Sequence, residues 1–197
     1  MSKQILAVLG VVVLLWSGGY FAPNEKLHPD GILIPAEPLQ DGRVKVRPWE
    51  KGEFLISPLA SYTITARVLS RENYWLGEEA KLSPTDLALG WGPASDNRLL
   101  SKIKISQGGR FYYWHTRDPD VDIGAIVSHS ANVHIIPGND SVAAALKRIG
   151  KGDLLTMKGY LIEATREDGF TWTSSLSRTD TGNGACEVFW VESLREL

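Results

Sequence analysis

The stretch YTITARV, residues 62–68, decides the fold class because its apolar and polar side chains alternate without a break. Alternation with a period of two is typical of a strand that has one face in a core and the other toward solvent. The apolar run CEVFWV, residues 186–191, predicts another strand, in the middle of a sheet. We therefore expect a domain that consists mainly of β-structure.

Turn sequences join two further pairs of predicted strands. Residues 102–107 and 110–115 flank Gly108-Gly109, which suits a tight two-residue turn because glycine accepts a positive φ. Residues 153–165 and 170–177 flank the polar turn Arg166-Glu167-Asp168-Gly169. Each pair predicts a β-hairpin.

Helices are predicted at only two places. Ser83-Pro84-Thr85-Asp86 has a capping serine and a proline at the first helical position, with Gly90 to end the helix. The run from Asn139 to Gly150 has a cap, an alanine-rich middle and a terminal glycine. The predicted fold class is α+β and β-rich: a curved antiparallel sheet or a small, partly open barrel of the oligosaccharide/oligonucleotide-binding (OB) type, with one main helix.

The N-terminal segment 5–22 reads ILAVLGVVVLLWSGGYFA and has no charged residue. As a helix it would be about 27 Å long, close to the roughly 30 Å hydrocarbon core of a bilayer. It predicts a single transmembrane anchor. Lys3 precedes it, which favours a cytoplasmic N-terminus and a periplasmic or other extracytoplasmic domain at the bacterial inner membrane. The expected anchor residues are Ile5, Leu9, Val12, Leu15, Trp16 and Tyr20.

The same segment has two alternative interpretations, a signal peptide cleaved near Ser17-Gly18-Gly19 and a buried core helix. The anchor and the signal peptide would both export the domain. Residues 23–48 hold five of the ten prolines and predict an extended stalk, because proline fixes φ and removes a hydrogen-bond donor. Residues 49–197 are expected to form the soluble β-rich domain.

Charge and cysteine content restrict the possible functions. Beyond residue 22 the chain has 20 basic and 23 acidic residues, a formal charge of −3. Such a domain lacks the broad positive field of a nonspecific nucleic-acid binder, so no nucleic-acid partner is predicted. Cys186 is the only cysteine, so no intramolecular disulfide can form and the core alone must stabilise the fold. No motif predicts a cofactor.

Three segments carry a resemblance to a group of uncharacterised bacterial membrane-anchored proteins. They are LSPTDLALGWGPASDN (82–97), SHSANVHIIP (128–137) and SSLSRTDTGNGACEV (174–188), the last with its Gly-Ala-Cys-Glu element. The resemblance covers most of the soluble domain and implies bacterial origin and export. It implies no activity.

His115, His129 and His134 are candidate metal ligands because they fall within twenty residues and neutral imidazole is a common ligand. Three aspartates follow the first histidine and offer oxygen ligands: Asp118, Asp120 and Asp122. However, His129 and His134 are five residues apart, so on a strand they would face opposite sides of the sheet. The aspartates are more typical of a solvated loop. We therefore predict no metal site.

The segment Ser128-His129-Ser130-Ala131-Asn132 places hydroxyls beside a histidine, the pattern of a nucleophile and its base. Adjacent residues on a strand point apart, so we do not expect Ser128 and His129 to pair. Asn132 and at least one histidine are expected to bond backbone groups or a carboxylate, because a buried polar group without a partner is costly. We interpret this segment as structural.

Two features are candidates for ligand binding. The aromatic strand Phe111–Trp114 offers rings for stacking, with Tyr112 and Trp114 as the candidate residues. The polar, glycine-containing loop 178–184 offers Arg178 and Asp180, although a turn stabilised by its own side chains is the simpler interpretation.

The sequence favours a noncatalytic, membrane-anchored envelope domain that binds a protein partner or scaffolds a membrane-associated assembly. Its other contact would be membrane lipid, through the N-terminal helix. One alternative is an envelope hydrolase or metal-dependent enzyme that uses the region of His129 and His134. Another is a ligand-binding module that uses the aromatic strand.

Overall fold

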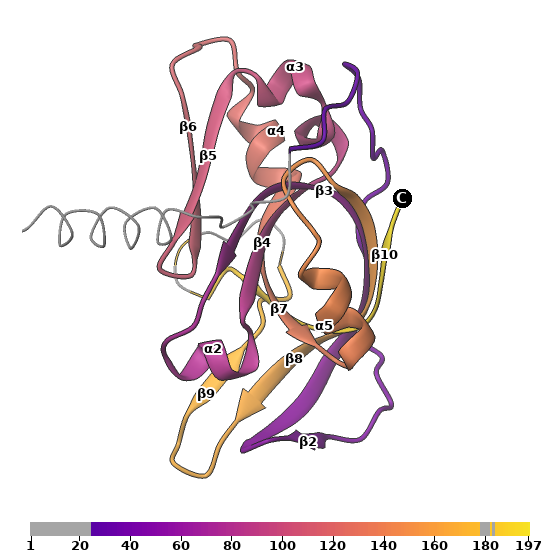
Figure 1. The fold of residues 1–197 in the computed structure, drawn as a ribbon, viewed down its shortest axis with the longest axis vertical. Coiled ribbons are helices and arrows are strands. Elements are labelled where there is room, and N and C mark those ends of the chain that lie inside the picture. Colours follow the sequence, from indigo (N-terminus) through magenta and orange to yellow (C-terminus); the bar gives the residue numbers. More distant parts are fainter. Residues whose placement is uncertain (1–24, 178–181, 183) are drawn as a thin grey trace, which may run out of the picture.

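The protein is described by a computed structural model that covers residues 25–177, 182 and 184–197. Figure 1 shows one large, strongly curved sheet with short helices around it, which confirms a β-rich fold with few helices. The predicted anchor, residues 5–22, lies outside this part of the chain. Within the described residues, no helix is long and apolar enough to cross a membrane.

The large sheet has eight strands. In chain order they are β1 (Leu39–Asp41), β2 (Trp49–Lys51), β3 (Phe54–Asn73), β4 (Thr85–Gly90), β7 (Ser130–Pro137), β8 (Leu154–Thr165), β9 (Thr171–Thr173) and β10 (Glu187–Glu196). A separate hairpin consists of β5 (Ile103–Gly108) and β6 (Phe111–Thr116). The helices are α2 (Glu78–Leu82), the 3-10 turn η1 (Gly92–Ser95), α3 (Asn97–Leu100), α4 (Ile123–Ser128) and α5 (Asp140–Leu146).

Five of these strands pair in a closed circuit in the order β3-β4-β7-β10-β8-β3. Every pair is antiparallel except β7–β10, which is parallel. The circuit can close because β3 is 20 residues long and uses different parts for its two neighbours. Residues 55–67 pair with β8 and residues 67–73 pair with β4.

The interior of the circuit is the main core. Every one of its five strands contributes apolar side chains there, and α5 closes one side with Val142 and Leu146. The fully buried residues of this core include Ile64, Leu87, Leu89, Val133, Ile135, Met157, Leu161 and Phe189. The alternation predicted for 62–68 is confirmed, because Tyr62, Ile64, Ala66 and Val68 all belong to this core.

A second apolar cluster lies on the outer face of the same strands. It contains Ile162 and Val188, with Tyr160, Trp172 and Trp190 packed against it. Tyr62 and Ile162 therefore belong to different clusters. Leu161 faces the interior, so the next residue along β8 must face outward.

The helix predicted from Ser83 is wrong, because Thr85–Gly90 is strand β4. Leu87 and Leu89 alternate with smaller or polar residues, and β4 pairs with β3 on one side and β7 on the other. Pairing on both sides outweighs the local helix signals, as tertiary context often does. A short helix, α2, lies just before this position.

The other local predictions fare better. Asn139 caps α5 through a 3.0 Å bond from the Val142 amide, as predicted, although α5 ends at Leu146 rather than near Gly150. Both hairpins form. In the β5–β6 hairpin Gly108 pairs with Phe111, so the turn consists of Gly109 and Arg110, which have φ of 59° and 71°. The predicted turn, Gly108-Gly109, was one residue too early.

The first described part of the proline-rich stretch lies against the domain rather than standing away from it. The Lys26 amide donates to the Lys151 carbonyl at 3.0 Å, and the Lys26 ammonium pairs with Asp153 at 2.9 Å. Further along, the Leu33 and Ile34 amides both bond the Ser95 hydroxyl. These contacts show that residues 26–34 do not form a free stalk.

Candidate functional site

A row of polar side chains lies on the outer face of β4 and β7. Leu87 and Leu89 point into the core, so Asp86 must point outward, and it pairs across the ladder with His134. Asn132 pairs with Ala88 on the same face. Although this is the outer face, all three polar residues are at most 3% exposed. Something else in the chain must cover them.

The cover is the β5–β6 hairpin, whose side chains reach Asn132 on β7 and Asp86 on β4. The Gln107 amide donates to Asn132 Oδ1 at 2.7 Å, and Asn132 Nδ2 donates to the Arg110 carbonyl at 2.9 Å. The Tyr112 hydroxyl lies 2.7 Å from the Ser130 hydroxyl. The hairpin is thus held to β7 by side-chain hydrogen bonds along its length.

Arg110 is the main attachment of the hairpin at its turn. Its Nη1 donates to Asp86 Oδ1 at 2.8 Å, its Nη2 donates to the Ser83 carbonyl at 3.0 Å, and its guanidinium lies 3.8 Å from the centroid of the Tyr74 ring. Its backbone has a positive φ, which is uncommon for a residue with a side chain. The contacts of this side chain hold that conformation in place.

His134 Nδ1 also lies 2.9 Å from Asp86 Oδ1, within ion-pair distance but without hydrogen-bond geometry. Its ring packs against Trp172 with centroids 4.8 Å apart. The second carboxylate oxygen of Asp86 has no hydrogen-bond partner among the described residues. This cluster is buried, and its ion pair between Arg110 and Asp86 holds the hairpin on the sheet.

A cavity of about 210 Å³ opens at the margin of the hairpin, between β6, β7 and the start of β10. Tyr112 and Trp114, two of the predicted ligand-binding residues, line it together with Asn132, Cys186 and Glu187. Burial raises the pKa of Tyr112, and the hydrogen bond with Ser130 opposes that effect. The phenol is therefore neutral at physiological pH and can both donate and accept a hydrogen bond. Arg178 and Asp180 lie outside the described residues.

The three candidate histidines have separate surroundings. His115 is exposed on β6 opposite Lys104, His129 follows α4, and His134 contacts Asp86 inside the buried cluster. Among the described residues, no group of three or more histidine, cysteine or acidic side chains is placed to hold a metal ion.

The candidate aspartates have local structural roles. Asp118 pairs with Lys102 at 3.0 Å and accepts a bond from the Asp120 amide. Asp122 caps α4 by accepting from the Ala125 amide at 3.1 Å. These contacts are typical of a loop that leads into a helix.

Ser128 and His129 do contact each other, contrary to our prediction. Ser128 ends α4 and His129 is its C-terminal cap, so neither lies on a strand, and Ser128 Oγ is 3.0 Å from His129 Nδ1. However, the Ser128 hydroxyl donates to the Gly124 carbonyl, and His129 Nδ1 lies 3.0 Å from the Ala125 carbonyl. A nitrogen that donates to a carbonyl cannot accept the serine proton, so this pair is not an activated nucleophile.

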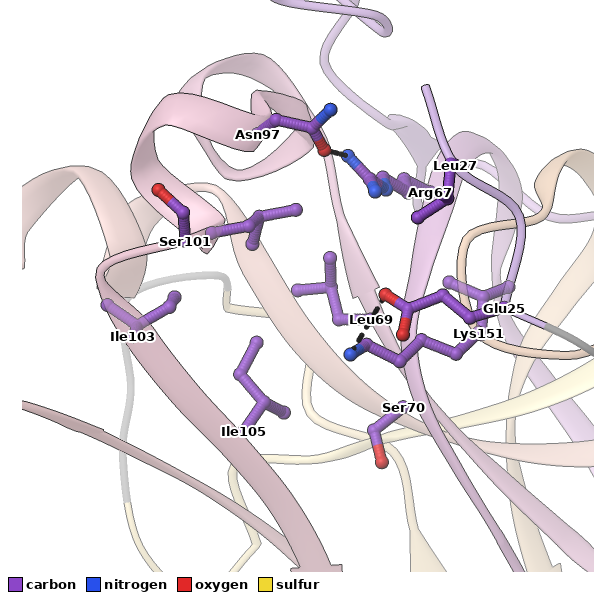
Figure 2. Close-up of a pocket in the computed structure, with 12 residues that line it drawn as sticks. Glu25, Leu27, Arg67, Leu69, Ser70, Asn97, Ser101, Ile103, Ile105 and Lys151 are labelled. Atoms are coloured by element: carbon purple, nitrogen blue, oxygen red, sulfur yellow. Dashed lines mark hydrogen bonds and ion pairs between the residues drawn. The ribbon is translucent and has the colours of Figure 1, made fainter. Parts of the chain in front are cut away.

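A larger cavity of about 360 Å³ lies on the other side of the hairpin (Figure 2). Glu25 and Lys151 lie at one edge, Arg67 and Asn97 lie at another, and aliphatic side chains from β3 and β5 form the floor. Neither this cavity nor Arg67 was predicted as a site, because its lining comes from four distant parts of the chain. The sequence contains no motif that would group them.

Comparisons with known proteins give no match to this chain, whether with protein-family models, curated proteins or solved structures. The resemblance to the bacterial membrane-anchored group therefore stays a prediction.

Proposed function

We propose that this chain is a noncatalytic, membrane-anchored envelope protein whose β-rich domain binds a protein partner or scaffolds a membrane-associated assembly. The observation that carries the proposal is the cavity beside the hairpin. It presents Tyr112 and Trp114 next to the buried amide of Asn132. Aromatic rings with a nearby polar group are typical of the anchor points at protein interfaces.

The strand order supports a barrel of the OB type, a fold that serves widely as a binding scaffold. Five strands in the order β3-β4-β7-β10-β8 close on β3, and the main helix α5 comes between β7 and β8. In such barrels, ligands bind the face of the second and third strands, here β4 and β7. The formal charge of −3 beyond residue 22 favours a protein partner over nucleic acid.

The contacts of the polar residues support a noncatalytic role. Asp86 contacts both His134 and Arg110 inside a buried cluster, and Ser128 donates to a helix carbonyl. A catalytic base and nucleophile would instead face a space that a substrate can enter. The membrane part of the proposal depends on residues 5–22, which have the length and apolar character of a spanning helix.

Site-specific photocrosslinking tests the binding role. A benzophenone amino acid replaces Trp114 in the intact chain, in membranes, and a matched chain carries it at Tyr113, which is 56% exposed on the other face of the same strand. We expect a discrete adduct from position 114 and none from position 113. Equal adducts at both positions, or none at either, would contradict a partner at this cavity. An adduct with a small molecule would favour the ligand-binding alternative.

A further inference from the structure

The cavity in Figure 2 contains a buried positive charge that is only partly neutralised. Arg67, on β3, is 5% exposed, and its Nη1 donates to the Ser95 carbonyl at 3.1 Å and to Asn97 Oδ1 at 2.6 Å. Both acceptors are neutral. Its Nε and Nη2 make no hydrogen bond to any described residue, and none of these residues forms an ion pair with it. Burying most of a guanidinium is costly, and an anion held by these two donors would offset that cost.

The neighbouring carboxylates already have other partners. Glu25 and Asp96 are near enough to favour the charged form of Arg67 and oppose the lowering of its pKa by burial. However, Glu25 pairs with Lys151 at 3.0 Å, and Asp96 pairs with Arg98 at 2.6 Å. Among the residues that line the cavity, Arg67 and Lys151 are basic and Glu25 is acidic, so the lining has one positive charge in excess.

The rest of the lining is aliphatic. Leu69 is 3% exposed and Ile103 is 9% exposed, and with Ile105 they form the apolar part of the lining (Figure 2). The volume of about 360 Å³ is within the range of small-molecule sites. A ligand that matches both features has an anionic head and a hydrocarbon chain.

We propose that this cavity binds an anionic amphiphile, whose carboxylate or phosphate is held by Arg67 and whose chain lies on Leu69, Ile103 and Ile105. The free Nε and Nη2 donors offer the planar fork that a carboxylate or phosphate accepts. This ligand chemistry depends on the cavity alone.

The inference that the ligand is a membrane lipid rests on the proposed anchor. Glu25 lines the cavity and follows the end of segment 5–22 by three residues. Three residues span at most about 11 Å, so an anchored chain would hold the cavity mouth at the lipid head groups. An acidic phospholipid at the membrane surface would then present its phosphate beside Arg67.

The test uses the intact chain in nanodiscs of zwitterionic lipid. The probe is decanoate with a photoactivatable diazirine on its chain, and the labelled residues are identified by peptide mass spectrometry. We expect labels on β3 and β5 near Leu69 and Ile105. Unlabelled decanoate should compete with the probe and prevent this labelling, whereas decyltrimethylammonium should not. We expect Arg67→Met to weaken competition about ten- to hundredfold, as loss of a bond to a charged group implies. The matched control is Arg195→Met, at an exposed position outside the cavity, and should leave competition unchanged.

A second variant covers the case in which Arg67→Met does not fold. Ile105→Glu places a negative charge on the half-buried floor and should abolish decanoate labelling. Shortening the chain should weaken competition about fourfold for each methylene removed. The proposal would be overturned if decanol or inorganic phosphate competed as well as decanoate does. Labelling at positions outside the cavity would also overturn it. If alkaline carbonate extracts the chain from membranes, the proposed anchor is wrong. Decanoate labelling would still test whether the cavity binds an anionic amphiphile.

Discussion

Replacement of Arg110 by methionine tests whether the hairpin is held on the sheet by a buried ion pair. Asp86 is 0% exposed, and Arg110 is the one guanidinium paired with it among the described residues; His134 Nδ1 also lies 2.9 Å from Asp86 Oδ1. Methionine keeps much of the side-chain volume but leaves the carboxylate buried without the guanidinium. Removing one partner of a buried pair typically costs about 3–5 kcal/mol. Loss of the contacts with Ser83 and the Tyr74 ring adds to that cost.

The free energy of unfolding is measured by urea titration of the intact chain in mild detergent, followed by tryptophan fluorescence. Arg117→Met is the matched control, because Arg117 is exposed just after the same hairpin, and it should change stability by less than about 0.5 kcal/mol. The double variant Asp86→Ala/Arg110→Met should be more stable than the sum of the single changes predicts, by about 0.5–3 kcal/mol. Hydrogen exchange should increase first in β5 and β6. If Arg110→Met unfolds at the same urea concentration as Arg117→Met, the ion pair does not hold the hairpin.

Three further predictions concern packing and pH. Ile162→Ala should lower the free energy of unfolding, measured by urea titration, by about 2–5 kcal/mol. The control Leu176→Ala, at a side chain that is 48% exposed, should change it little. Gly159→Ala should destabilise by at least ~1–3 kcal/mol because its Cβ would lie 1.9 Å from the Trp190 carbonyl oxygen, and Gly108→Ala, with open space around its Cβ, is the control. Hydrogen bonds from Arg166 lower the pKa of Asp168 from 3.8 to about 2, so this pair should contribute stability above pH 4 and lose it as the pH falls toward 2. In thermal unfolding between pH 6 and pH 2, Asp168→Asn should therefore lose less stability than the wild type does; equal losses would contradict the assignment.

The sequence predicts those elements whose signals are local. Residues 62–68 alternate, residues 166–169 are a turn, and Asn139 is a helix cap, and each of these signals acts within a few residues. The error at 83–90 shows the limit of local signals. A serine, a proline and an acid favour a helix there, but β3 and β7 supply hydrogen bonds on both sides of the segment and make it a strand.

The candidate sites were harder to predict because their parts come from distant positions. Asp86 and Arg110 are 24 residues apart and meet only because the hairpin folds back on β4. Without that contact, Asp86, Asn132 and His134 look like exposed polar residues on the outer face of a sheet. Arg67 presented a similar problem, since its place in the alternation of 62–68 predicted a solvent-facing side chain. Residues 95–105 cover it, and no pattern in 62–68 reveals that cover.

The position of the hairpin also restricts where the proposed partner would bind. In a barrel of the proposed OB type, the face of β4 and β7 would be the binding surface, but here Gln107, Arg110 and Tyr112 occupy it through bonds to the two strands. The proposed partner would therefore contact the hairpin itself, or its margin, where Trp114 lines the smaller cavity. The larger cavity lies at the opposite margin and is lined by Ile103 and Ile105 of β5. Because both cavities share the hairpin as a wall, a change that loosens the hairpin, such as Arg110→Met, should weaken crosslinking at position 114 and decanoate labelling together.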